Sequence, residues 1–223
     1  MKPVTQSRKK WRSWLKRIYN DIQFLLISKH IYDEIGNIYL TNKEIQEPAD
    51  FHDWVIRNYG ISSSVTIRRL TDNRRDSISL IRLLGEIRDT PDAISRRSYV
   101  RWYNANMKWI GKKRFDQLNG NKALSHLSKT IIEKDIKQII KSAKRIRRFV
   151  DTQVAHLDQK NKKRKYPTFN ELDNSIFTIE RIFLKYQELL TGTSPQTLLP
   201  IWSYDWKTIF KTSWLKTKNT NAA

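Results

Sequence analysis

Apolar residues recur along most of this chain at a spacing near 3.6 residues, the period of an α-helix. The first such stretch covers about residues 7–40 and the second covers 49–70. A third, short and strongly apolar, follows a turn at residues 71–76, with Ser77 or Asp76 as its expected N-cap. The pattern therefore predicts long helices in the first half of the chain.

The second half continues in the same way. Ser95 is expected to begin a short helix, after which the periodicity weakens around Gly111 and at residues 119–121, where the pattern predicts a loop. A long helical pattern then extends from Lys122 into the segment 141–158. These features predict a second group of helices separated by one irregular region.

The last long helix has clear signals at both ends. Thr168 is its expected N-cap, with Glu171 three residues later as a capping-box partner, and Gly192 lies just past its end. The remaining residues, 193–223, are rich in Trp, Tyr and Phe and are expected to pack back on the helices as an extension. The predicted architecture is thus an all-α bundle over residues 1–192 with an aromatic and basic C-terminal extension.

The composition agrees with this fold class and limits the chemistry. Six Gly and six Pro in 223 residues provide few tight turns for an all-β fold. The chain has no cysteine, which excludes disulfides, thiolate metal sites and cysteine nucleophiles. The four histidines lack metal-ligand spacing and no phosphate-binding glycine loop is present, so no metal and no cofactor are expected.

The net charge indicates a polyanionic partner. Forty-three Lys and Arg against twenty-two Asp and Glu give a formal charge of +21, which favours RNA or another polyanion over an unspecific, solvated Lys-rich surface. The chain has no signal-peptide pattern and no apolar stretch long enough to span a bilayer. We therefore expect a cytoplasmic protein without a membrane association.

The segment KSAKRIRRFVDTQVAHLD, residues 141–158, combines this charge with candidate chemistry. On a continuous α-helix, Arg145, Arg148, Thr152 and His156 share one face, while apolar residues form a separate stripe. Such a helix suits a phosphodiester ligand. The expected nucleic-acid contacts in and around it are Lys144, Arg145, Arg147 and the basic loop residues Lys162, Lys163 and Arg164.

A second basic cluster lies at residues 68–75. Its Arg68 and Arg69 are candidate nucleic-acid contacts, and Arg68 can also pair with Asp72 across one helical turn. An ion-paired helix end is as good an interpretation of this cluster as a polyanion contact.

His156 is the histidine whose neighbours suggest catalysis. Metal-independent RNA cleavage requires a base for the 2′-OH proton and a cation for the charge that develops on phosphorus, and His and Arg suit these two roles. Residue types alone nevertheless favour a histidine that caps or packs the helix. The candidate catalytic set is His156, Arg148, Asp151 and Thr152.

The segment DTQVAHLD (151–158) resembles the end of the Arg-x(4–6)-His motif of HEPN domains, in particular that of the abortive-infection AbiU-type family. SVTIRRLTDNRRDSISLIRLLGEI (64–87) and PTFNELDNSIFTIERIFLKYQELLTG (167–192) also resemble blocks of that family, as do the later DW and SW pairs. The resemblance covers nearly the whole chain and implies a HEPN-like helical bundle.

The resemblance implies that His156 is the catalytic base and that an upstream Arg binds the phosphate. Here the sequence departs from the pattern, because Phe149, Val150 and Asp151 occupy the usual Arg positions. Seven residues separate Arg148 from His156, and eight helical steps span about 12 Å. Pairing of two HEPN domains, common in this group, allows Arg148 to serve the site of a partner.

Three functions remain open at this point. The first is a metal-independent endoribonuclease of bacterial defence or toxin type, which by resemblance would leave a 2′,3′-cyclic phosphate and a 5′-hydroxyl. The second is a non-catalytic module that binds nucleic acid or protein and dimerises, and the third is a basic helical scaffold. The expected partners are RNA, a second copy of the chain, and an antitoxin or other defence-system protein.

Overall fold

The computed structural model describes residues 2–46, 49–154 and 166–211, and these residues are almost entirely helical. Within these ranges no β-strand forms, and the backbone pairing is limited to an isolated bridge between Ser95 and His126. The α-helices are α1 (Lys2–Thr41), α2 (Asp50–Leu70), α3 (Leu80–Asp89), α4 (Arg96–Tyr99), α5 (Lys108–Asn119), α6 (Lys129–Phe149), α7 (Phe169–Thr191) and α8 (Thr208–Lys211). The all-α prediction is confirmed.

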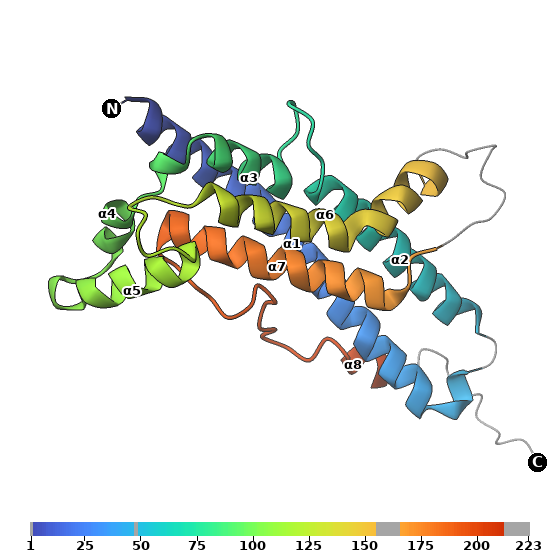
Figure 1. The fold of residues 1–223 in the computed structure, drawn as a ribbon. Helices are drawn as coiled ribbons and strands as arrows, with labels where there is room; N and C mark the ends of the chain where they lie inside the picture. Colours follow the sequence, from blue (N-terminus) through green and yellow to red (C-terminus); the bar gives the residue numbers. More distant parts are fainter. Residues whose placement is uncertain (1, 47–48, 155–165, 212–223) are drawn as a thin grey trace, which may run out of the picture.

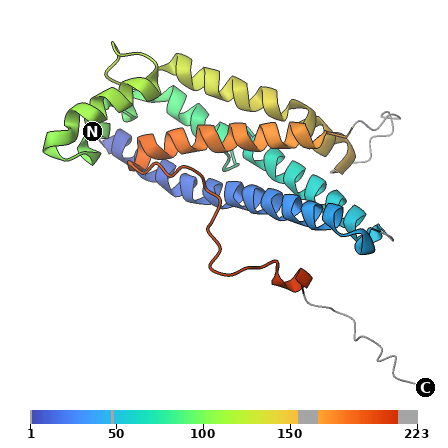
Figure 2. The ribbon, with the colours of Figure 1, turned by 90° about the horizontal axis from the view of Figure 1, so that it is seen from below.

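Four long helices, α1, α2, α6 and α7, form an antiparallel bundle (Figures 1 and 2). The chain runs along α1, returns through α2, and repeats this movement with α6 and α7. Helix α3 continues the layer of α2, so that α2 and α3 both pack on α6. Helices α4 and α5 lie at the end of the bundle where α1 begins. No helix in the described ranges combines the length and apolarity needed to cross a membrane.

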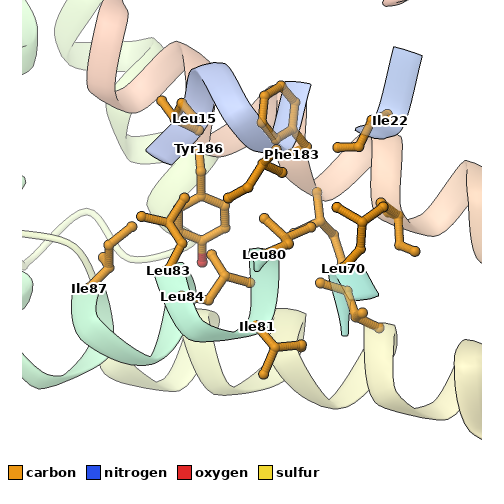
Figure 3. Packing of buried hydrophobic residues seen from close by; sticks show 14 of the residues in the cluster. Leu15, Ile22, Leu70, Leu80, Ile81, Leu83, Leu84, Ile87, Phe183 and Tyr186 are labelled. Carbon is orange, nitrogen blue, oxygen red and sulfur yellow. The ribbon is translucent and has the colours of Figure 1, made fainter. Parts of the chain in front are cut away.

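The core is built from the apolar stripes that the sequence predicts. Leu80, Leu83, Leu84 and Ile87 of α3 are fully buried and meet side chains of α1 and α7, including Phe183 (Figure 3). Full burial of such a side chain contributes about 1.5–3 kcal/mol to folding, before the opposing chain entropy is counted. Helix α3 also packs on α6. These contacts together fix the position of α3 and order the turn that precedes it.

The start of α3 differs from the sequence prediction. Its N-cap is Ser79 instead of Ser77 or Asp76, because Ser79 has an extended backbone and its Oγ accepts a hydrogen bond from the Arg82 N–H at 3.0 Å. The Ser77 hydroxyl donates instead to the carbonyl of Arg74 and closes the preceding turn. The N-cap prediction was wrong by two to three residues.

The predicted loop around Gly111 was also wrong, since α5 passes through this residue. A Cβ at position 111 would lie 2.7 Å from the ring of Tyr103, so the glycine permits close packing instead of breaking the helix.

Helix α6 begins at Lys129 instead of Lys122. Asn119 holds the intervening segment in a loop, because its side chain accepts from the Ser128 N–H at 2.6 Å and donates to the His126 carbonyl at 3.1 Å.

The last long helix has the ends that the sequence predicts. Thr168 and Glu171 form a reciprocal capping box, and Gly192 takes a left-handed conformation (φ 76°) just after α7. In the extension, the Trp202 ring stacks on His30 at 4.5 Å and Lys207 Nζ lies 2.8 Å from Glu34 Oε2. Leu198 is also buried. Through Trp202 and Lys207 the extension therefore contacts α1.

Candidate nucleic-acid interface

Helix α6 changes its geometry where the candidate motif begins. The α-helical part of α6 ends at Phe149, and Val150–Val154 form a π-helical turn, called the π-turn below. The predicted common face of an uninterrupted α-helix therefore does not continue past Phe149. Thr152 instead donates its hydroxyl to the carbonyl of Arg148 at 2.8 Å. Single π-turns inside helices frequently occur at functional sites.

Buried apolar residues anchor this end of α6. Ile146, Phe149 and Val150 are buried, and the Phe149 ring lies 5.3 Å from that of Tyr166. The basic residues of the same turns consequently face outward: Lys144 and Arg148 are exposed and Arg147 is half-buried. In the part of the chain that the structure describes, no carboxylate pairs with any of these three cations.

Asp151 of the π-turn is paired with an arginine from α2. Arg68 Nε donates to Asp151 Oδ1 at 2.7 Å, and Arg68 Nη1 lies 3.5 Å from Asp72 Oδ1, which confirms the expected Arg68–Asp72 pair. The hydrogen bond to Asp151 raises the pKa of Arg68. The ion pair therefore connects the end of α2 with the π-turn and places a second guanidinium beside the motif.

Asp72 connects this pair to the turn before α3. Burial alone would raise the pKa of Asp72, but hydrogen bonds from Arg74 and the nearby charge of Arg68 lower it below its usual value. Arg74 Nε donates to Asp72 Oδ2 at 2.9 Å. The basic cluster at residues 68–75 is thus partly neutralised within the fold.

Two further candidate nucleic-acid contacts are engaged in ion pairs. Arg69 binds both carboxylate oxygens of Asp21, at 2.9 and 2.5 Å. Arg145 Nη1 donates to Glu171 Oε1 at 2.7 Å and thereby contacts the capping box of α7. Burial opposes ionisation of Glu171, yet the Thr168 N–H and Arg145 lower the pKa of this carboxyl group. Contact of Arg69 and Arg145 with a polyanion stays a prediction.

The remaining candidates lie outside the described residues. These are His156 and the basic loop residues Lys162, Lys163 and Arg164. The structure thus brings Arg148, Asp151 and Thr152 together at one end of α6. It adds Arg68 to this group from a position 83 residues earlier in the chain.

The comparisons with known proteins identify the family. A family model for HEPN_AbiU2, described as AbiU2, matches residues 8–211. The chain belongs to the AbiU2 HEPN family. Neither the curated proteins nor the solved structures include a significant match. The family assignment confirms the resemblance noted in the sequence and identifies the bundle as a HEPN-type fold of the abortive-infection group.

Two features of this interface were not predicted from the sequence. The Arg68–Asp151 pair depends on the packing of α2 against the end of α6, which no local pattern reports. The π-turn also has no local composition signal. The departure in the motif itself, with Val150 and Asp151 at the usual Arg positions, was visible in the sequence and coincides with the π-turn.

Proposed function

We propose that this AbiU2-family protein binds RNA in bacterial defence, as a toxin-type effector, and cleaves it without a metal ion. The observation that carries the proposal is the group of cations Lys144, Arg147 and Arg148 in the last turns of α6, which form none of the described ion pairs and immediately precede the π-turn. His156 follows the π-turn in the sequence. Membership of the AbiU2 HEPN family supports the same assignment. Exposed guanidinium and ammonium groups without carboxylate partners retain their full attraction for phosphates.

In the proposed reaction, His156 removes the proton from a ribose 2′-OH. The 2′-oxygen then bonds to phosphorus, and the bond from phosphorus to the 5′-oxygen breaks. The 5′-oxygen accepts a proton from solvent and His156 releases its proton to solvent, so the products are a 2′,3′-cyclic phosphate and a 5′-hydroxyl. Arg148 stabilises the negative charge on the phosphoryl oxygens in the transition state. Asp151 and Thr152 act as positioning residues, through Arg68 and the Arg148 carbonyl respectively.

The cleavage assay uses the purified full chain and single-stranded RNA in the presence of EDTA. The wild-type protein is expected to generate fragments with cyclic phosphate ends. His156→Ala should lose this activity, whereas His126→Ala, a matched change at a half-buried histidine before α6, should retain it. Intact RNA after incubation with the wild-type protein, or equal activity of H156A, would refute the nuclease assignment.

The seven residues between Arg148 and His156 in the sequence lead us to propose that two copies share each site. On a regular α-helix, positions eight residues apart are about 12 Å apart, which is too far for both side chains to contact one phosphate. In this proposal Arg148 therefore acts on the site of the partner. Mixing R148Q with H156A then restores one complete site per mixed dimer, which predicts about a quarter of the wild-type rate at equal amounts. Recovery should fail if both residues act within one chain.

The same seven-residue separation favours a second candidate, a HEPN module that binds RNA or a partner protein, such as an antitoxin, without cutting. RNA binding that weakens steeply with salt, in a protein without cleavage activity, would support this alternative.

A further inference from the structure

A second basic surface lies at the opposite end of the bundle from the π-turn. The two longest stretches without Asp or Glu are residues 1–20 and 93–115, and each contains seven Lys and Arg. The fold brings these stretches together, because the start of α1 lies beside α4 (Figure 1). Uncompensated charge from two distant parts of the sequence is therefore concentrated at one place.

Two grooves form at this end of the bundle, and the larger of them lies where the two stretches meet. The larger, about 710 Å³, lies between α1 and α4 and is lined by Thr5, Arg8, Lys9, Arg12, Ser13, Lys16, Ser98, Arg101 and Trp102. The smaller, about 500 Å³, lies between α4 and α5 and is lined by Arg96, Arg97, Val100, Arg101, Lys108, Lys112 and Ser125. Arg101 lines both grooves, and none of the described lining residues is acidic.

Most of these cations have no intramolecular ion pair among the described residues. In the smaller groove Arg96 does have a partner, Asp116, at 2.7 Å. Just outside the larger groove, Lys10 pairs with Glu86 at 2.7 Å. In contrast, six lining cations are exposed and form none of the described ion pairs: Lys9, Lys16, Arg97, Arg101, Lys108 and Lys112. Cations of this kind are the usual phosphate contacts of nucleic-acid-binding proteins.

One residue that lines the larger groove has an unsatisfied donor. Arg8 Nε is buried and has no hydrogen-bond partner in the described structure, a rare condition for a buried polar atom. Burial and the neighbouring charges of Arg12 and Arg101 lower the pKa of Arg8. An anion in this groove would reduce the repulsion among the three guanidinium groups.

An aromatic ring lies beside these charges. The Trp102 side chain is 46% exposed, and the Arg12 guanidinium lies 5.3 Å from its ring centroid. Exposed aromatic rings among cations are typical of proteins that bind single-stranded nucleic acid, since bases stack on the ring while phosphates contact the charges. A concave surface also fits a linear strand better than a flat lipid bilayer.

We propose that the two grooves form one basic tract that holds the phosphate backbone of single-stranded RNA, away from the cleavage motif. The inference takes the identity of the polyanion from the proposed function, but it does not depend on cleavage. The tract adjoins the N-terminal end of α6 and the π-turn follows its C-terminal end. The 21 residues of α6 separate the two by about 30 Å. A strand with the phosphate spacing of duplex DNA, roughly 3.4 Å, would need about nine nucleotides to connect them, and a more extended single strand would need fewer.

The test compares two variants of equal charge, both made in the H156A background so that the RNA stays intact. The tract variant is K9Q/R101Q/K112Q. The control, K43Q/R57Q/K137Q, removes three exposed cations from other surfaces. Binding of a fluorescein-labelled single-stranded RNA of about 20 nucleotides is measured by anisotropy at several salt concentrations. The tract variant should bind about tenfold more weakly, with a salt slope smaller by about 2, because each lost phosphate contact removes about 0.7.

Equal affinity of the tract variant and the control would overturn the inference, because the RNA would then respond only to total charge. Loss of binding to phosphatidylserine vesicles by the tract variant, with unchanged RNA binding, would overturn it as well and assign the surface to membranes. Failure of the wild-type protein to cleave RNA would refute the proposed function alone. The two results are therefore distinguishable.

Discussion

The end of the bundle that carries the basic tract depends on one buried carboxylate. Glu188 of α7 is almost fully buried, with a side-chain exposure of 5%. Its Oε1 accepts hydrogen bonds from the Tyr99 hydroxyl at 2.6 Å and from Arg114 Nε at 2.7 Å, and its Oε2 accepts from Arg114 Nη2 at 2.7 Å. These contacts attach α4 and α5 to α7. The Glu188→Gln substitution tests their contribution without changing the side-chain size.

The expected loss follows from the geometry. A glutamine keeps one acceptor oxygen but places an NH₂ group against the second guanidinium donor, so one charge-assisted hydrogen bond is lost and two donors face each other. Removal of one partner from a buried ion pair costs about 3–5 kcal/mol. Since Arg114 is 42% exposed, water can solvate its freed donor, which reduces the expected cost to about 2–3 kcal/mol.

Thermal and urea unfolding of E188Q measure this cost. For a chain of this length the loss corresponds to a Tm lower by about 4–12 °C. The control is E133Q, at an exposed glutamate of α6 without a described ion pair, and its stability should stay within about 0.5 kcal/mol of the wild type. Equal stability of E188Q and E133Q would refute the reasoning.

The same pair has a defined pH dependence. Burial opposes ionisation of Glu188, but the hydrogen bonds from Arg114 and Tyr99 lower its pKa below the ordinary 4.5. A carboxyl group with a lowered pKa in the folded state stabilises the fold fully above the unfolded-state value, and this contribution is lost as the pH falls through the folded-state pKa. The stability difference between wild type and E188Q should therefore be greatest at neutral pH and decrease below about pH 4.5. A difference that is constant with pH would contradict this.

Two further predictions concern the backbone and the interface. Gly192→Ala should destabilise the protein by more than about 1 kcal/mol, because position 192 has φ 76° and a Cβ would lie 2.6 Å from Trp102. Gly36→Ala should instead stabilise α1 by about 0.5–1 kcal/mol in the same unfolding assay, because a Cβ at position 36 meets nothing within 4 Å. A double-mutant cycle of R68Q and D151N should give a coupling energy of about 0.2–1 kcal/mol, because both side chains are partly exposed. A coupling near zero would show that this ion pair does not hold the π-turn.

The sequence predicted the helices better than their ends. Period and capping signals located α1, α2 and α7, because one face of each is buried and the Thr168–Glu171 box acts locally. The errors arose where tertiary contacts override local preference. Gly111 lies under the Tyr103 ring inside α5, and Asn119 holds residues 121–128 out of α6 through hydrogen bonds that no periodicity reports.

The candidate site was predictable in composition but not in charge balance. The basic residues of α6 and the motif before His156 are visible in the sequence. The sequence does not show which arginines are neutralised by ion pairs, since the partners of Arg69 and Arg68 lie 48 and 83 residues away. The basic tract had one signal that the sequence interpretation did not use: the absence of any acidic residue before Asp21.

The two ends of α6 should consequently make separable contributions to the proposed reaction. If the proposal holds, the tract contacts RNA equally in the ground state and in the transition state, because the length of α6, about 30 Å, separates the tract from the π-turn. Charge removal there, as in K9Q/R101Q/K112Q, should raise KM and leave kcat unchanged. R148Q should instead lower kcat, because the charge that Arg148 stabilises develops only in the transition state. Single-turnover cleavage at saturating protein separates the two effects, and a tract variant that loses kcat would show that the tract participates in the chemical step.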